Sequence, residues 1–284
     1  MADRHPSPRA LLDRYDLRAK RSWGQNFLGD EAVLDDIARL VAPAAGETVL
    51  ELGAGLGHLT ARLLSRGARV VAVERDRDMV RVLRGELGDR IVLLEADAAR
   101  LDLADLAARF GAPAPGGGPP RLAVAGNLPY HLTSPILFSL LDQVGHVARA
   151  VFLLQREVAE RLAAAPGSRD WGVLSVLLQR EADVSVERIV RPGAFWPPPK
   201  VESAVLRAAF RPPADPVRDP SRFRRLVKAG FGQRRKTLRN ALEAARIADR
   251  SRLEVAMAAA GVDPGRRGET LVLAEWAALE RALG

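Results

Sequence analysis

A short segment after an apolar run carries the residues with the clearest capacity for chemistry. Residues 121–126 read RLAVAG, a pattern typical of a buried strand, and Asn127, Pro129 and Tyr130 follow directly. The Asn127 side-chain oxygen and the Pro129 carbonyl can accept both protons of an aromatic amine and so favour a nucleophilic nitrogen. Tyr130 offers a face on which a flipped-out base can stack. A plain turn with a core tyrosine is the alternative, because Asn and Pro are common turn residues.

Three other predicted strand ends present residues to the same place. The first is ELGAGLG, in which Gly53 and Gly55 let the backbone approach a ligand closely. Glu74 ends the second strand. An acid at this distance along the chain from the glycine segment commonly hydrogen-bonds the ribose hydroxyls of a bound nucleotide. Asp97 ends the third strand and can accept a hydrogen bond from an adenine amino group. The alternatives are a solvated charge at Glu74 and a helix N-cap at Asp97.

The glycine spacing separates this pattern from a dinucleotide site. The segment has the form GxGxG: its third glycine is Gly57, and His58 stands where the dinucleotide pattern GxGxxG has its last glycine. A glycine loop, a ribose acid, an adenine acid and Asn-Leu-Pro-Tyr together favour S-adenosylmethionine as the cofactor over NAD. Methyl transfer by in-line displacement depends mainly on proximity and orientation, so no histidine base is required. A nicotinamide oxidoreductase is therefore the weaker alternative.

Composition restricts the class of protein further. The chain has 284 residues, 48% of them hydrophobic, with no cysteine and four scattered histidines. Disulfides, thiol nucleophiles and cysteine zinc sites are excluded, and we expect no metal. No apolar run approaches the roughly 18 to 20 residues needed to span a bilayer. The N-terminus lacks the apolar segment of a secretory signal, so we expect a cytoplasmic protein without a membrane partner.

Positive charge is concentrated in one region. The net charge is +8, and residues 218–239 hold nine basic residues against one acid, Asp219. A local concentration of this kind favours contact with a nucleic acid over a merely solvated face. The residues that we expect to contact RNA are Arg222, Arg225, Lys228, Arg234, Arg235, Lys236 and Arg239.

The order of predicted elements indicates an α/β fold. Five short apolar runs alternate with amphipathic helical stretches, a pattern typical of a parallel sheet covered by helices. Residues 171–190 predict a helix and then a strand, and residues 193–210 predict a proline-rich loop and an edge strand. Residues 220–284 show only helical periodicity. We therefore expect a domain at 1–212, with residues 1–20 flexible, and a small helical RNA-binding domain at 213–284. The predicted parallel strands are 48–52, 68–74, 90–97, 122–127 and 148–155.

With these features in place, the sequence resembles the small-subunit ribosomal RNA adenine dimethyltransferases of the kasugamycin-resistance type. The resemblance covers almost the whole chain, and its segments occur in the order of the family. It implies a Rossmann-like class I S-adenosylmethionine-dependent methyltransferase domain followed by a small all-α domain. The matching segments include KRSWGQNFLGD, VLELGAGLGHLT, VVAVERD, EADA, GNLPYHLTSPIL, GAFWPPPKVESAVLR and FGQRRKTLRNAL.

The resemblance also implies roles for individual residues. Residues 127–130, which include Leu128, would form the catalytic loop, and Phe195 would be a second aromatic wall for the target adenine. The alternative for Phe195 is a core phenylalanine, and the alternative for Gln25 and Asn26 is a capping turn. The implied cofactor contacts are Gln25, Asn26, Leu28, Gly53, Gly55, Glu74, Asp97 and Asn127.

The activity implied is dimethylation of two adjacent adenines near the 3′ end of 16S rRNA. The substrate would be a 30S subunit or a late assembly precursor, and the enzyme would act as a monomer. One position departs from the family pattern, because Ala54 stands where proline is usual. Alanine there also occurs in the 23S rRNA dimethyltransferases of the macrolide-resistance type, which form one alternative. The other is a non-catalytic RNA-binding assembly factor.

Overall fold

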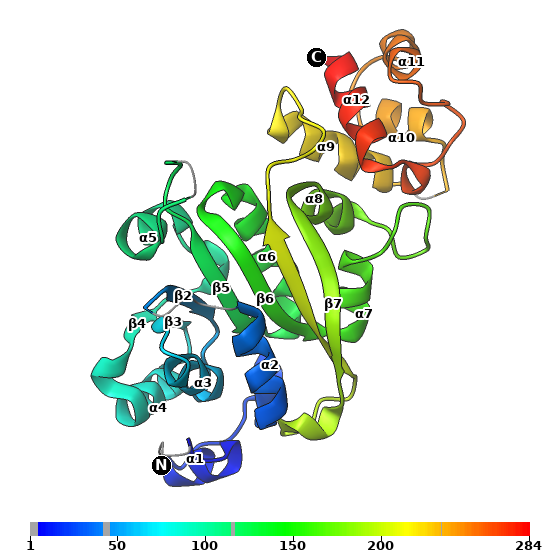
Figure 1. Ribbon diagram of the computed structural model, residues 1–284. Coiled ribbons are helices and arrows are strands. Elements are labelled where there is room, and N and C mark those ends of the chain that lie inside the picture. The colour runs from blue at the N-terminus through cyan, green and yellow to red at the C-terminus, as the bar shows by residue number, and fades with distance from the viewer. Residues whose placement is uncertain (1–4, 42–45, 115–116, 234) are drawn as a thin grey trace. The chain divides into compact units, whose positions relative to one another are not determined.

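The computed structural model describes residues 5–41, 46–114, 117–233 and 235–284 (Figure 1). The chain divides into two compact units. The first unit contains residues 1–159 and 185–210, and the second contains residues 160–184 and 211–284. The segment 160–184 thus groups with the C-terminal residues, whereas the boundary expected from the sequence placed it in the first domain.

A seven-stranded sheet forms the centre of the first unit. Its strand order is β4-β3-β2-β5-β6-β9-β7, and the first five strands in this order are parallel. The predicted α/β fold with a parallel sheet is therefore confirmed. Because parallel neighbours end at the same edge, the carboxyl ends of β3, β2 and β5 lie side by side. The strands are β2 (Thr48–Leu52), β3 (Arg69–Glu74), β4 (Val92–Glu95), β5 (Leu122–Asn127), β6 (Val147–Gln155), β7 (Ala182–Val190) and β9 (Ser203–Phe210).

The expectation of an edge strand within residues 193–210 is wrong. Strand β9 lies between β6 and β7, and it pairs with β6 in antiparallel register. The edge position belongs to β7, whose inner residues alternate between exposed and partly buried, whereas most of β9 is buried. Near-continuous burial is what an inner strand requires, because both of its faces are covered.

Helices of the first unit pack on the sheet and bury an apolar core against it. Helix α2 (Glu31–Val41) contacts β5 and β6, and α3 (His58–Ser65) contacts α2 and β3. The core joins side chains such as Val49, Leu63 and Val151, each of them fully buried. The other helices of this unit are α1 (Pro8–Arg14), α4 (Arg77–Leu87), α5 (Leu103–Phe110) and α6 (Thr133–Asp142), while α7 (Arg156–Leu162) spans a boundary between the units.

Residues 5–20 differ from the flexible segment that the sequence predicts. Ser7 caps α1 by accepting a hydrogen bond from a backbone N–H, and Leu11 is fully buried in a cluster with Phe27. The Arg14 guanidinium donates two hydrogen bonds to the Glu86 carboxylate, at 2.8 and 3.0 Å. This N-terminal arm, residues 5–20, is therefore a packed part of the first unit; the expectation for residues 1–4 falls outside the described residues.

The second unit is helical apart from the start of β7. It contains α8 (Val173–Glu181), α9 (Pro220–Phe231), α10 (Leu238–Ala244), α11 (Arg250–Ala259) and α12 (Leu273–Leu283). Its core holds Trp276, whose ring leaves no room for a side chain at Gly230. Across the described ranges, no helix combines the length and apolar character that crossing a membrane demands.

Candidate active site

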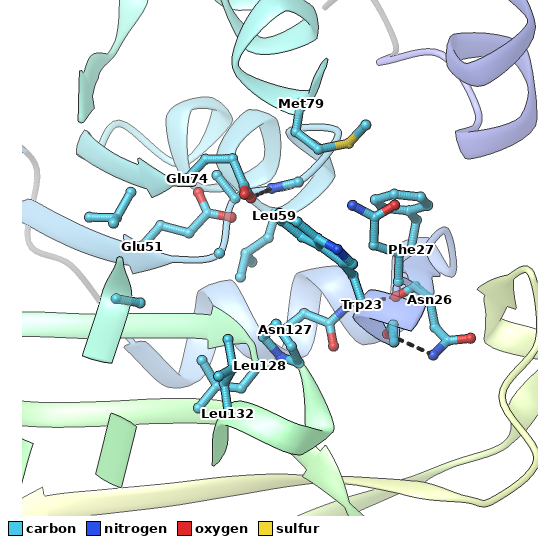
Figure 2. A pocket seen from close by; sticks show the side chains of 18 of the residues that line it. Trp23, Asn26, Phe27, Glu51, Leu59, Glu74, Met79, Asn127, Leu128 and Leu132 are labelled. Atoms are coloured by element: carbon cyan, nitrogen blue, oxygen red, sulfur yellow. Dashed lines mark hydrogen bonds between the residues drawn. The ribbon is translucent and has the colours of Figure 1, made fainter. Parts of the chain in front are cut away.

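A pocket in the first unit lies at the carboxyl ends of β2, β3 and β5. Its wall also includes the segment Trp23–Leu28, of which Trp23, Asn26 and Phe27 are labelled to the right of Glu51 and Glu74 in Figure 2. All of its lining residues belong to the first unit. The sequence predicted that these strand ends face one ligand, and the structure brings them to a single cavity.

The glycine loop between β2 and α3 needs glycine for backbone reasons. Gly53, Gly55 and Gly57 all have positive φ angles of 73°, 56° and 84°. L-residues rarely adopt this region, so side chains there would strain the loop. The Gly53 N–H donates to the carbonyl of Val73 at 2.9 Å, which ties the loop to the end of β3. The backbone of the loop thus forms one wall of the pocket.

Glu74 holds this loop through its carboxylate. One oxygen accepts the N–H of Gly55 at 2.9 Å, and the other accepts the N–H groups of Arg75 and Asp76, both at 2.8 Å. Burial raises the pKa of Glu74, and the three N–H donors oppose that shift. The carboxylate lines the pocket and keeps acceptor capacity on the oxygen that bonds Gly55, because a carboxylate oxygen has two lone pairs.

A second carboxyl group, that of Glu51, lies on the floor of the pocket and was not predicted. Its side chain is almost fully buried and accepts a hydrogen bond from the Thr60 hydroxyl at 2.6 Å. Burial raises the pKa of Glu51 to about 8, and the neighbouring charge of Glu74 adds to the increase. Glu51 therefore carries its proton at neutral pH.

The raised pKa of Glu51 predicts how stability depends on pH. The ordinary pKa is 4.5 and the folded value is about 8, so between these values the folded state binds a proton that the unfolded state releases. The contribution of Glu51 to the free energy of unfolding is greatest below about pH 4.5. It falls as the pH rises toward 8, by at most about 1.4 kcal/mol per pH unit. Glu51→Gln should remove this slope. Urea unfolding at several pH values checks the prediction. Parallel plots of the free energy of unfolding against pH for the parent and the variant would contradict it.

The end of β5 places the predicted catalytic loop at the pocket. The Asn127 amide nitrogen donates to the backbone carbonyl of Asn26 at 3.0 Å. Because that nitrogen is engaged, the other end of the amide, its oxygen, is the part available to a ligand. Leu128 is buried, with its N–H bonded to the carbonyl of Leu153. Asn127 and Leu128 are drawn together in Figure 2.

Pro129 and Tyr130 also line the pocket. The Pro129 carbonyl accepts the N–H of Leu132 at 2.9 Å, in the short turn that begins at Tyr130. The Thr133 hydroxyl donates to the same carbonyl at a longer distance of 3.4 Å, so this weaker bond is the one that a donor on a ligand can replace. The Tyr130 hydroxyl lies 2.8 Å from the hydroxyl of Ser203 on β9, which fixes the ring.

The N-terminal segment contributes the facing wall. The Gln25 amide donates to Asp76 at 2.7 Å and accepts the N–H of Lys20 at 2.8 Å, so its polar atoms hold the segment in place. Asn26 donates to the carbonyl of Gly24 at 3.0 Å. Gln25, Asn26 and Leu28 all line the pocket. The side-chain bonds of Gln25 and Asn26 are those of a local turn, as the capping-turn alternative expects, and contact of these residues with a cofactor stays a prediction.

Two predicted site residues are absent from the residues that line the pocket. Asp97 caps a short helical turn, accepting the N–H of Ala99 at 3.0 Å, and its second oxygen lies 3.6 Å from the Arg75 guanidinium. Its neighbours Ala96 and Ala98 do line the pocket. Phe195 is buried in the apolar core of the first unit. For both residues, contact with a ligand remains a prediction.

Trp23 is the most prominent pocket residue that sequence reasoning missed. Its indole projects into the cavity between Glu74 and Asn127 in Figure 2. The Arg75 guanidinium lies 4.7 Å and the Lys20 ammonium 5.3 Å from the ring centroid. The sequence feature that could have identified Trp23 is its position as an aromatic residue directly before the GQNFL segment. His131, which the sequence left as a loop residue, is exposed and also lines the pocket.

Two histidines join the N-terminal arm to the glycine loop. The His5 ring bonds to the carbonyl of Leu56 and the His58 ring bonds to the carbonyl of Pro6, both at 2.9 Å. Burial lowers the pKa of His58 to about 4, and His5 contributes to the shift. Both imidazoles are therefore neutral at physiological pH. In the described part of the chain, no group of acidic and histidine side chains is arranged to hold a metal ion.

The predicted RNA contacts lie in the second unit and differ in their surroundings. The Arg222 guanidinium is paired with the fully buried Glu280 carboxylate at 2.6 Å. Arg239 is paired with Glu254 at 2.9 Å. Arg234 lies outside the described residues. The four predicted contacts with exposed side chains are Arg225, Lys228, Arg235 and Lys236.

Comparisons with known proteins agree on one family. A family model described as "Ribosomal RNA adenine dimethylase" matches residues 16–279. A protein of Anaeromyxobacter sp. (strain K), named "Ribosomal RNA small subunit methyltransferase A", is 86% identical over the full length of both chains. A protein of the same name from Myxococcus xanthus (strain DK1622) is 54% identical, covering 98% of this chain and 95% of the relative.

Solved structures show the same fold. The 23S rRNA methyltransferase ErmE has a TM-score of 0.65 at 26% identity, covering 91% of this chain and 99% of that one. A dimethyladenosine transferase from Plasmodium falciparum has a TM-score of 0.68 at 21% identity, covering 89% of this chain and 95% of that one.

Proposed function

The chain belongs to the ribosomal RNA adenine dimethylase family, and we propose that it dimethylates two adjacent adenines near the 3′ end of 16S rRNA. The choice of the small subunit is supported by relatives at 86% and 54% identity that carry small-subunit names. The large-subunit enzyme ErmE is only 26% identical. Because the chain belongs to this family, it is an rRNA adenine methyltransferase. What we propose in addition is the identity of the two adenines that it methylates.

We propose S-adenosylmethionine as the methyl donor, and the pocket residues fit it. A Cβ atom on Gly53 would lie 3.7 Å from the Pro129 ring and 3.8 Å from the Asn127 carbonyl oxygen, in the space between two strand ends. These are ordinary van der Waals distances, so the positive φ angle of 73° is what favours glycine at this position, and glycine leaves bare backbone that a ligand can approach closely. When bound, this donor supplies an electrophilic methyl group on a sulfonium. The spare acceptor position of Glu74 suits a ribose hydroxyl.

Asn127 carries the mechanism that we propose. Its amide nitrogen is held by Asn26, and its oxygen can then accept one proton of the adenine amine. The Pro129 carbonyl accepts a hydrogen bond from the second amine N–H, in place of the long bond from the Thr133 hydroxyl. Tyr130, fixed by Ser203, provides the stacking face for the base. Two acceptors at one amine localise the lone pair on the nitrogen, and positioning lowers the rest of the barrier.

Two in vitro measurements test this function. Calorimetry should show one S-adenosylmethionine bound per chain, and labelled methyl groups should transfer to unmethylated small-subunit particles. Transfer to naked 23S rRNA instead would identify the macrolide-resistance activity. Absence of cofactor binding would identify a non-catalytic assembly factor. We also propose that the enzyme works as a monomer on a 30S subunit or late precursor, and therefore in the cytoplasm; light scattering checks its mass.

The exposed basic residues of the second unit give a prediction for binding. Arg235→Ala combined with Lys236→Ala should weaken binding to small-subunit particles, because two phosphate contacts are lost. The slope of log affinity against log salt should fall by about 1.4, at roughly 0.7 per contact with single-stranded RNA. Filter binding at several salt concentrations measures the slope. Arg250→Ala, which removes an exposed arginine paired with Glu254, is the control and should leave the slope unchanged.

A further inference from the structure

The four tryptophans of the chain divide into two kinds. Trp171 and Trp276 are fully buried in the second unit. Trp23 and Trp196 belong to the first unit and are 36% and 45% exposed. Trp23 lines the pocket, so its exposure has an explanation. Trp196 does not line it, so the pocket does not account for the exposure of this second ring.

Trp196 is held next to the pocket by a two-stranded ribbon. Strand β1 (Phe27–Leu28) pairs antiparallel with β8 (Phe195–Trp196), and Phe27 lies directly opposite Trp196. Directly opposite residues of such a pair point to the same side. Phe27 is buried and lines the pocket, so the exposed Trp196 is tied through this register pair to a residue of the pocket wall.

The backbone around Trp196 is rigid. On one side Phe195 is anchored in the apolar core, and the carbonyl of Ala194 accepts the N–H of Gly29 at 2.9 Å. On the other side residues 197–199 are three prolines, whose φ angles are fixed by their rings. A ring presented by such a backbone loses little conformational freedom on binding, which favours affinity.

One cation lies over the ring, and a second follows it closely in the sequence. The Arg9 guanidinium of α1 lies 5.6 Å from the centroid of Trp196. Its helix is held there because Pro8 packs against Gly29, where an added Cβ would lie 3.1 Å from the proline ring. The only acid recorded near Arg9 among the described residues is Asp13, at 3.8 Å and itself exposed. Lys200 follows the prolines and is also exposed.

We propose that Trp196, Arg9 and Lys200 form a second RNA-binding surface, the Trp196 surface, on the methyltransferase unit. It binds an unpaired stretch of rRNA beside the target adenines: one base stacks on the indole, and the two cations contact phosphates. Aromatic rings interleaved with basic side chains are the arrangement that binds single-stranded nucleic acid. The inference rests on the proposed function for the identity of the RNA, and it adds a contact outside the basic helices.

Direct binding of unmethylated small-subunit particles, measured by filter binding, tests the Trp196 surface. Trp196→Ala should weaken binding about 5- to 50-fold, in the range expected for one stacked base, and Trp196→Phe should recover most of the loss. Arg9→Gln should weaken binding about threefold and lower the salt slope by about 0.7. Val92→Ala, which trims an exposed apolar side chain on the far edge strand β4, is the control and should bind as the parent does.

Separate readouts distinguish the possible failures. Thermal melting and S-adenosylmethionine calorimetry should give the parent values for every variant, because none of these residues lines the pocket. Particle binding by Trp196→Ala and Arg9→Gln at the parent affinity would overturn the inference while leaving the proposed function intact. A loss in Trp196→Ala with no loss of salt slope in Arg9→Gln would indicate an apolar protein contact on the particle instead, and would also overturn it. Failure of the parent itself to bind particles or cofactor would refute the proposed function.

Discussion

Asn127→Ala is expected to lower kcat for methyl transfer by about 100- to 1000-fold, the range seen when one preorganised polar contact to a reacting group is removed. The substitution deletes the oxygen that we assign to the adenine amine. It also deletes the amide nitrogen that bonds Asn26, so the wall segment loses one hydrogen bond. Single-turnover transfer of labelled methyl groups to unmethylated particles measures the effect.

Binding measurements separate catalysis from folding in this variant. Particle affinity should be nearly unchanged, because the basic helices and the Trp196 surface are intact. Asn240→Ala is a matched control: this asparagine is exposed at the start of α10 in the second unit. It should retain the parent rate. Full activity of Asn127→Ala would remove the role that we give to the residue.

Glu74→Gln is expected to cause the second large effect, on cofactor affinity. One oxygen of Glu74 accepts two N–H groups and the other accepts the N–H of Gly55. Glutamine can supply only one oxygen, so its NH₂ group would face the Gly55 N–H, donor against donor. An unsatisfied buried donor costs about 1–3 kcal/mol, and the glycine loop should shift away from its ligand position. We expect S-adenosylmethionine affinity to fall about 10- to 100-fold by calorimetry.

Glu95→Gln is the matched control for this change. Glu95 ends the neighbouring strand β4, directly beside Glu74 in the parallel register. Its side chain is exposed and pairs only with the exposed Arg77 among the ion pairs of the described residues. Substitutions at such surface positions usually change the free energy of unfolding by no more than about 0.5 kcal/mol. Equal cofactor affinity in Glu74→Gln and Glu95→Gln would contradict the role of Glu74.

The strand ends could be predicted from the sequence because their information is local. A short apolar run followed by glycines, an acid or Asn-Leu-Pro-Tyr identifies both the strand and the residue that ends it. Parallel pairing then brings Gly53, Glu74 and Asn127 to the same edge without further knowledge. The structure adds the hydrogen bonds, of which the Gly55 to Glu74 contact is the most informative.

The features that were missed depend on contacts between distant segments. Gly85 interrupts an otherwise regular helix, and its reason appears only when the arm docks: an added Cβ would overlap the Tyr15 hydroxyl. The Tyr15 hydroxyl then reaches Glu86 at 3.0 Å. Nothing in the local pattern of residues 1–20 indicates this partner, so the segment was expected to be flexible. The pairing of β9 with β6, and the division that places residues 160–184 with the helical unit, are likewise set by tertiary packing.

The most direct test of the central claim is mass spectrometry of rRNA fragments from cells with and without this gene. We predict that the parent strain carries two adjacent dimethylated adenines near the 3′ end of 16S rRNA, and that both are unmodified in the deletion strain. A gene copy encoding Asn127→Ala should fail to restore them. Fully dimethylated adenines in the deletion strain, or a change confined to 23S rRNA, would contradict the claim.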